Sequence, residues 1–141
     1  MAYYDKIALL ILNEDSTQFL VCEPADDYAS GARQYLLPGG TIQEHETPTE
    51  CLQRKIFEEL ALQVNGDDLK LVGEYHDVSA ASPDRDVSIQ LYQGAVNGKP
   101  IVYREFKALH WIGRGDIGNE NVSPIIRHKI IPDLINKSIL K

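Results

Sequence analysis

The chain has 141 residues, of which 43% are hydrophobic and 25% are charged, and its formal net charge is −7. We predict one domain over residues 1–141, because this length can bury a core without disulfide or metal staples. The acidic balance argues against unspecific binding to a nucleic-acid polymer. It does not exclude a small anionic substrate, because a bound divalent cation can reverse the local field.

The two cysteines, Cys22 and Cys51, provide neither a disulfide framework nor a zinc-binding spacing. A reducing cytoplasm is therefore the expected location. The apolar run over residues 7–12 is too short for a signal-peptide core or a membrane span. We accordingly expect no membrane partner.

Three short strands are predicted in the first part of the chain, over residues 6–13, 18–23 and 35–37. Polar residues 13–17 are typical of a turn between the first two strands. Residues 24–34 contain a proline, two aspartates and a glycine, which favour a loop. The Pro38-Gly39-Gly40 sequence is expected to end the third strand.

The most distinct helix signal begins at Thr47, which is a good N-cap residue. Pro48 suits the first helical position, and Glu50 lies three residues past the cap, where it can complete a capping box. An apolar stripe follows at intervals of four residues: Leu52, Ile56 and Leu60. The pattern predicts a helix that ends at Asn65-Gly66.

Four further strands are predicted in the second half, over residues 69–78, 87–96, 100–104 and 108–112. A polar loop over residues 79–86 separates the first two, and Asn97-Gly98 is typical of a tight turn. Ser123-Pro124 repeats the cap-and-proline start and predicts a second helix to about Lys137, kinked or broken at Pro132. Strands mixed with two helices favour an α/β sheet that is covered on both faces.

A longer pattern extends across the first helix. Glu46 lies six positions after Gly40, Arg54 lies eight after Glu46, and the pair Glu58-Glu59 follows. With the preceding Leu-Pro-Gly, residues 40–62 resemble the Nudix box, which is Gly, five residues, Glu, seven residues, then Arg-Glu-aliphatic-x-Glu-Glu-x-Gly-aliphatic. The resemblance implies a Nudix fold, a mixed β-sheet sandwiched between helices.

The residue types of the pattern also suit phosphoryl chemistry. Hydrolysis of a phosphoric anhydride needs charge stabilised on phosphoryl oxygens and a water delivered in line. Glu58 and Glu59 lie side by side on the helix, and their hard carboxylate oxygens suit Mg²⁺ or Mn²⁺. Arg54 lies one turn before Glu58 and can pair with it. A glycine turn lets a backbone carbonyl approach a metal closely.

By resemblance, this protein would be a divalent-metal-dependent hydrolase of phosphoanhydride bonds in nucleoside-diphosphate-linked small molecules. Glu58, Glu59 and the Gly40 carbonyl would bind Mg²⁺ or Mn²⁺, Arg54 would orient a ligand, and Glu46 would brace the loop–helix junction. Nucleoside triphosphates are the preferred substrate class, followed by nucleotide sugars and ADP-ribose. Dimerisation is common in the family, so a homodimer is expected.

Two positions depart from the family pattern. Ala61 replaces a glycine and, as a better helix former, favours a longer or more tightly packed helix end. Lys55 replaces a metal-binding glutamate, which shifts the charge beside the metal by two units. Its amine can turn to solvent and leave a two-glutamate site, or occupy the metal position and contact phosphate. It can also abolish hydrolysis and leave a regulatory nucleotide-binding domain; we favour weakened or altered metal use with activity retained.

Three further residues complete the predicted site. The segment Glu105-Phe-Lys-Ala-Leu-His-Trp resembles a downstream family segment, Glu-x-x-x-Leu-x-Trp, whose glutamate reaches the metal cluster or acts as general base. Glu105 is therefore the candidate base or additional metal ligand. Arg33 and Tyr35 precede the box on a strand that borders the expected site, and with Lys55 they are candidates for substrate contact. Structural roles for Arg33 and Tyr35 are equally compatible with the sequence.

Overall fold

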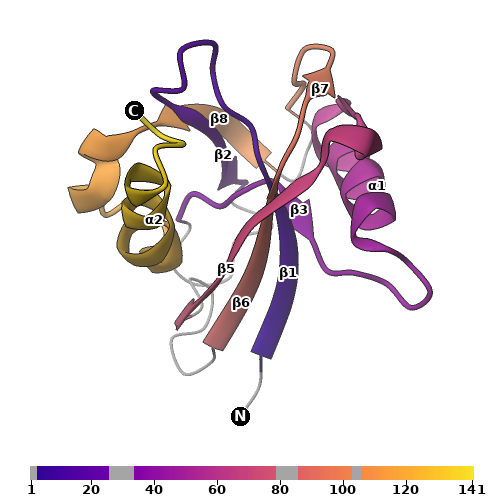
Figure 1. The fold of residues 1–141 in the computed structure, drawn as a ribbon, viewed down its shortest axis with the longest axis horizontal. Helices are drawn as coiled ribbons and strands as arrows, with labels where there is room; N and C mark the ends of the chain where they lie inside the picture. Colours follow the sequence, from indigo (N-terminus) through magenta and orange to yellow (C-terminus); the bar gives the residue numbers. More distant parts are fainter. Residues whose placement is uncertain (1–2, 26–33, 79–85, 103–105) are drawn as a thin grey trace.

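The computed structural model describes residues 3–25, 34–78, 86–102 and 106–141 (Figure 1). Its strands are β1 (Tyr3–Leu10), β2 (Phe19–Pro24), β3 (Gly39–Gly40), β4 (Gln63–Val64), β5 (Lys70–Val78), β6 (Asp86–Gln93), β7 (Val96–Asn97) and β8 (Phe106–Ile112). Its helical elements are α1 (Pro48–Leu60), the short η2 (Gly66–Asp68) and η3 (Arg114–Gly118), the π-helical turn η4 (Ile126–Ile130) and α2 (Ile131–Asn136).

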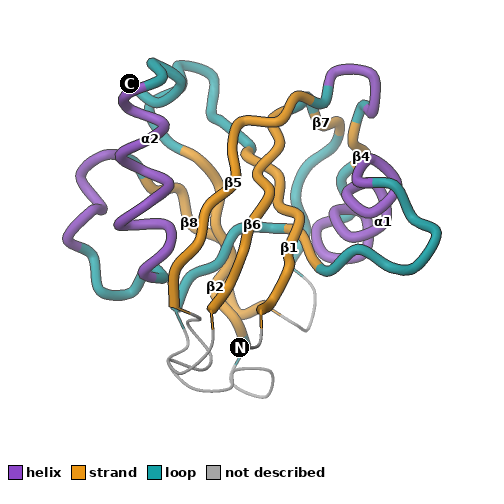
Figure 2. Tube along the Cα trace, turned by 60° about the horizontal axis from the view of Figure 1, so that its bottom comes forward, coloured by secondary structure: helices purple, strands orange, loops and turns teal. Residues whose placement is uncertain are grey.

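The strands form one four-stranded sheet and two pairs. In the larger sheet the order is β3-β1-β6-β5, with β1 parallel to β6 and the other neighbours antiparallel. Antiparallel pairs join β2 to β8 and β4 to β7. Helix α1 lies on one side of these strands, and η4 with α2 lies on the other (Figures 1 and 2). The predicted mixed sheet between helices is confirmed.

Two hydrophobic clusters explain why the N-terminal strands are apolar at successive positions. The α1-side cluster includes Ile7, Leu9, Leu20, Cys22, Leu52 and Ile56. The α2-side cluster includes Ala8, Leu10, Phe19, Val21, Ile130 and Leu134. Side chains alternate between the faces of a strand. Because β1 and β2 bury both faces, odd and even positions enter different clusters.

Helix α1 begins as predicted but ends earlier. Thr47 Oγ1 accepts a hydrogen bond from the Glu50 N–H at 3.1 Å, and a Glu50 carboxylate oxygen accepts one from the Thr47 N–H at 3.0 Å. The last helical residue is Leu60, and Ala61 has left-handed torsions of φ 57° and ψ 27°. The expectation that Ala61 extends the helix is wrong, because the chain needs a left-handed residue there to leave the helix.

The C-terminal helical segment ends close to the predicted Lys137, and the predicted kink or break at Pro132 takes the form of a π-helical turn. A π-helical turn over Ile126–Ile130 precedes α2, and Pro132 lies in the first turn of α2. Proline has no N–H to donate and crowds the preceding turn, so no α-helical hydrogen bond can run from residue 132 to the His128 carbonyl, which lies in the wider turn.

Two strand predictions also need correction. Residues 100–102 lie in no strand, and 103–105 are outside the described residues. The third strand was predicted at residues 35–37, where the structure has isolated bridges, and it is Gly39–Gly40 that pairs with β1.

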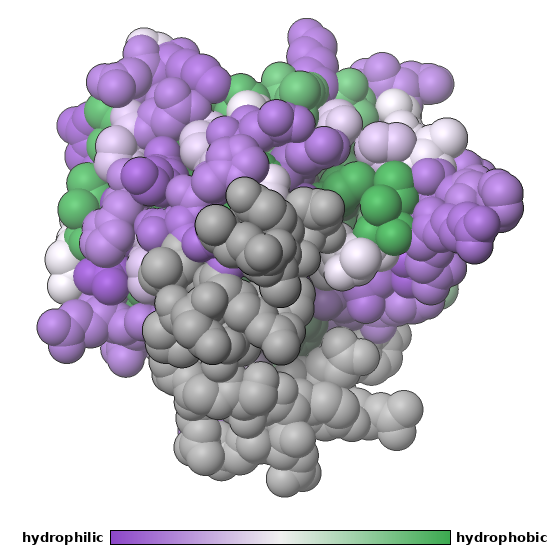
Figure 3. All heavy atoms as spheres, turned by 90° about the horizontal axis from the view of Figure 1, so that it is seen from below, coloured by the Kyte–Doolittle hydropathy of each residue, from purple (hydrophilic) through white to green (hydrophobic). Residues whose placement is uncertain are grey.

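No helix in the described ranges is long and apolar enough to cross a membrane. Viewed from below, the described surface is mostly hydrophilic, with small separate groups of hydrophobic residues (Figure 3).

Candidate active site

The Gly39–Gly40 strand brings the box loop against the sheet. Gly39 has φ +147°, and a Cβ added there would lie 2.1 Å from the Ile7 carbonyl oxygen and 2.7 Å from the Ala8 Cα. Only glycine allows this approach, because a side chain would collide with the backbone of β1. The turn is therefore fixed in place beside the first residues of the box.

Glu59 is held by this turn. One of its carboxylate oxygens accepts a hydrogen bond from the Gly39 N–H at 3.0 Å, and the residue is only 7% exposed. The neighbouring Cys22 thiol has its pKa raised by burial and, to a smaller extent, by the charge of Glu59. The buried carboxylate thus has a defined position at the junction of α1, β2 and β3.

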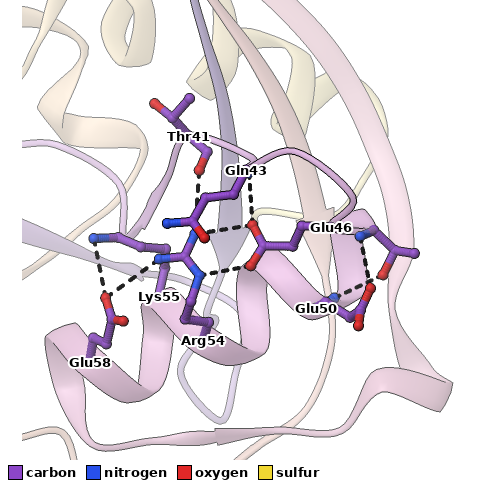
Figure 4. A network of polar contacts seen from close by, with 8 residues as sticks. Thr41, Gln43, Glu46, Glu50, Arg54, Lys55 and Glu58 are labelled. Atoms are coloured by element: carbon purple, nitrogen blue, oxygen red, sulfur yellow. Dashed lines mark hydrogen bonds and ion pairs between the residues drawn. The ribbon is translucent and has the colours of Figure 1, made fainter.

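Arg54 and Glu46 join the helix to the box loop (Figure 4). Arg54 donates from Nε to one Glu46 oxygen at 2.7 Å and from Nη2 to the other at 3.1 Å. Glu46 also accepts from the Gln43 N–H at 2.9 Å, and Arg54 Nη2 reaches the Thr41 carbonyl at 3.4 Å. The hydrogen bonds from Arg54 are the main reason that the pKa of Glu46 falls to about 2. Together these contacts hold loop residues 41–46 against α1.

Glu58 lies between two cations. Its Oε2 atom is 3.6 Å from Arg54 Nη1 and 3.7 Å from Lys55 Nζ, and its side chain is 53% exposed (Figure 4). The predicted pairing of Arg54 with Glu58 is present, but the two shorter Arg54 contacts go to Glu46. Both contacts of Glu58 given above are ion pairs, at 3.6 and 3.7 Å, on a half-exposed side chain, so Glu58 is held less firmly than Glu59.

Lys55 lies across Gly40. A Cβ added at Gly40 would meet Lys55 Cε at 2.6 Å and its Cδ and Cγ at 3.0 Å, and the lysine side chain is only 20% exposed. Its amine points toward Glu58 (Figure 4). Of the orientations expected from the sequence, the one in which the amine turns out to solvent is not seen, because the amine lies beside Glu58.

The remaining predicted site residues lie elsewhere or cannot be placed. Arg33 and Glu105 are outside the described residues. Tyr35 packs against the α2-side cluster, and its ring stacks on His110 with centroids 4.2 Å apart. His110 Nε2 is in turn 2.7 Å from a Glu23 carboxylate oxygen.

Sequence reasoning missed the Gly39 N–H as the partner of Glu59, and it missed the Tyr35–His110–Glu23 arrangement. The first follows from the β1–β3 pairing, which no local pattern indicates. The second depends on the β2–β8 register, in which Val21 is opposite His110 and Glu23 lies two residues farther along β2.

The oxygen atoms of the box residues suit a divalent cation that takes few ligands from the protein. The described part of the chain contains no group of three or more histidine, cysteine or acidic side chains placed to hold a metal. Glu58, Glu59 and the Gly40 carbonyl nevertheless offer the hard oxygens that Mg²⁺ and Mn²⁺ prefer, and Mg²⁺ commonly keeps several of its waters. The box residues therefore fit such a metal in chemistry, with the Lys55 ammonium as a nearby competing charge.

Comparison with known proteins gives the family match and the fold of the chain. A family model described as NUDIX domain matches residues 3–134. No sequence match was found among curated proteins. A MutT protein from Methanosarcina mazei superposes with a TM-score of 0.77 at 19% identity, covering 96% of this chain and 95% of that one. A NUDIX hydrolase from Nitrosomonas europaea gives 0.68 at 16% identity, covering 97% and 88%. At these identities the structural matches show a common fold.

Proposed function

This chain belongs to the Nudix family, and from that premise we propose that it hydrolyses a phosphoanhydride bond in a nucleoside-diphosphate-linked small molecule. The preferred substrates are nucleoside triphosphates, which would give a nucleoside monophosphate and pyrophosphate. The observation that carries the proposal is the Glu59 carboxylate, which is buried and held by the Gly39 N–H at the start of the box.

In this proposal, Glu58, Glu59 and the Gly40 carbonyl hold Mg²⁺ or Mn²⁺. The bound metal would neutralise charge on the phosphoryl oxygens and favour ionisation of water. The Gly39 N–H fixes one Glu59 oxygen, so the carboxylate enters the reaction already oriented. Arg54 pairs with Glu46 and thereby holds the box loop at a fixed distance from α1.

The proposal also assigns a general base and contacts to the substrate. Glu105 is the candidate base on the resemblance of its segment alone. Arg33 is a candidate for phosphate contact. Tyr35 is a candidate for contact with the nucleobase, and its ring stacks on His110. Lys55 is close enough to Glu58 to contact a phosphate bound beside it.

A second candidate function is regulatory nucleotide binding without turnover. The observation that favours it is the Lys55 ammonium 3.7 Å from Glu58, where a positive charge opposes metal binding. Nucleotide sugars and ADP-ribose remain alternative substrates within the hydrolase proposal.

The deciding experiment measures phosphate and pyrophosphate release from a panel of nucleotides with Mg²⁺ or Mn²⁺. We expect turnover by the wild type and at least a hundredfold loss in Glu59→Gln, because the amide cannot replace a charged ligand. Glu74→Gln, an exposed carboxylate on β5, is the matched control and should retain full activity.

Two results would contradict the proposal in different ways. If Glu59→Gln remains as active as the wild type, the assignment of the metal ligands is wrong. If the wild type is silent across the panel and Lys55→Glu gains turnover, the natural sequence has the regulatory function.

A further inference from the structure

The side chain of Lys55 packs over the glycine turn at the start of the box. Its aliphatic stem fills the space that Gly40 leaves by having no side chain, with Cε, Cδ and Cγ all within 3.0 Å of an added Cβ. A surface lysine on a helix normally extends its ammonium into water. Here the stem is packed against the box turn and the side chain is four-fifths covered. The position of the ammonium is therefore set by the fold.

The charges around the ammonium indicate what it does. Nζ lies 3.7 Å from Glu58 Oε2, and the same oxygen lies 3.6 Å from Arg54 Nη1. Arg54 is already committed to Glu46 through two shorter hydrogen bonds. Lys55 differs from Arg54 in this respect: within the described residues, its amine has no contact shorter than the 3.7 Å contact with Glu58.

We propose that Lys55 is a tethered counter-cation that competes with a divalent metal for Glu58. Its ammonium supplies one positive charge where the metal would otherwise supply two. A metal that binds must therefore displace the ammonium from Glu58 or bind near an uncompensated like charge. The inference rests on the proposed function, because it takes Glu58 as a metal ligand.

The consequence is a site that binds free metal weakly and becomes stronger when the lysine is neutralised. Lys55→Met keeps an unbranched stem that can pack over Gly40 but removes the charge. Lys129→Met removes the same charge from an exposed position in η4, on the other side of the sheet, and is the matched control. A general effect of net charge would appear equally in both variants.

The test is a titration of each protein with Mn²⁺ in the absence of nucleotide, with free Mn²⁺ measured by electron paramagnetic resonance. We expect Lys55→Met to bind Mn²⁺ at least tenfold more tightly than the wild type, and Lys129→Met to change the affinity less than twofold. A thermal melt establishes that each variant is folded. An unchanged Mn²⁺ affinity in folded Lys55→Met would overturn the inference.

A double-substitution experiment assigns the effect to Glu58. If the lysine competes for that carboxylate, Lys55→Met should gain at most threefold in a Glu58→Gln background. A full tenfold gain there would overturn the assignment to Glu58. If the wild type turns over nucleotide but Lys55→Met does not gain Mn²⁺ affinity, the inference fails and the proposed function stands. If Lys55→Met gains Mn²⁺ affinity but no variant turns over nucleotide, the proposed hydrolysis fails and the competition for Glu58 stands.

Discussion

The two helical segments begin with the same sequence signal and both bury an apolar face, but they differ in the hydrogen bonds at their start. Thr47 is the N-cap of α1, whose first residue is Pro48, and Ser123-Pro124 precedes η4. At the first site, the threonine hydroxyl and the Glu50 carboxylate each accept a backbone hydrogen bond from the other residue. At the second, the Ser123 hydroxyl is buried and has no hydrogen-bond partner in the described part of the chain.

The residue three positions after the cap accounts for the difference. Glu50 can reach back to the cap N–H, whereas Ile126 cannot. The Ser123 carbonyl accepts from the Ile126 and Arg127 N–H groups, so its backbone starts the turn without the hydroxyl. The site-bearing helix α1 thus has a polar cap at its start in addition to its buried apolar face, whereas the C-terminal segment relies on apolar burial.

The largest effect on stability is expected from shortening a buried side chain on the apolar face of the C-terminal helical segment. Ile130 is fully buried in the α2-side cluster, so Ile130→Ala removes buried methyl groups and leaves a cavity. We expect a loss of about 2–5 kcal/mol in the free energy of unfolding, measured by urea denaturation. Lys129→Ala, at the exposed neighbouring position, should stay within about 0.5 kcal/mol of the wild type. Equal losses in the two variants would show that burial does not hold this segment.

Alanine substitutions of the two cap residues, Thr47 and Ser123, should have different effects on stability. Thr47→Ala removes a hydroxyl that accepts from Glu50 and should destabilise the protein by about 1 kcal/mol. Ser123→Ala removes a buried hydroxyl without a partner and should leave stability unchanged or raise it by up to about 1 kcal/mol. Urea denaturation checks both. A loss in Ser123→Ala equal to that in Thr47→Ala would break the comparison.

The same contrast explains how far the sequence could predict the molecule. The start of α1 was predictable, because Thr47, Pro48 and Glu50 interact within one helical turn. The mixed sheet and the Nudix fold were predictable from the strand pattern and the box. An interruption at Pro132 was also predictable, but its form as a π-helical turn was not, because the missing proline N–H does not specify which hydrogen bonds replace the lost one.

The candidate site likewise has features that the sequence predicts and features that depend on the pairing of distant segments. The spacing of Arg54, Glu58 and Glu59 along a helix predicts that they share one region. The direction of the Lys55 amine was left open, because it depends on the space over Gly40, which is set by the pairing of β3 with β1. The roles of all these residues in metal binding and catalysis stay predictions. So do the roles of Arg33 and Glu105 and the homodimer.

The helix ends provide a comparison in which the two regions should behave alike. Ala61 after α1 has φ 57°, and Ser138 after α2 has φ 59°. Left-handed torsions cost a residue with a side chain roughly 1–2 kcal/mol, and glycine avoids this cost but loses more entropy on folding. We expect Ala61→Gly and Ser138→Gly each to raise the free energy of unfolding by about 0.5 kcal/mol in urea denaturation. A gain at one position only would show that tertiary contacts, and not torsion, decide it.

The smallest expected effect is the pH dependence of the box loop. The hydrogen bonds from Arg54 lower the pKa of Glu46 from an ordinary value of 4.5 to about 2 in the folded protein. Between these values the unfolded chain takes up the proton more readily than the folded one, so the stabilisation is complete above about pH 5 and is lost as pH falls toward 2. The advantage of the wild type over Glu46→Gln in thermal melts should therefore shrink across this range.

Glu44→Gln is the matched control for this measurement. Glu44 lies in the same loop, but its side chain is 88% exposed and its recorded ion pair is a 3.5 Å contact with the equally exposed His45. Its melting temperature should follow that of the wild type from pH 7 to pH 2, because solvent screens such a pair. If Glu46→Gln also follows the wild type throughout, Arg54 does not hold the loop through Glu46, and the loop must be positioned by the packing of Gly39 on β1 alone.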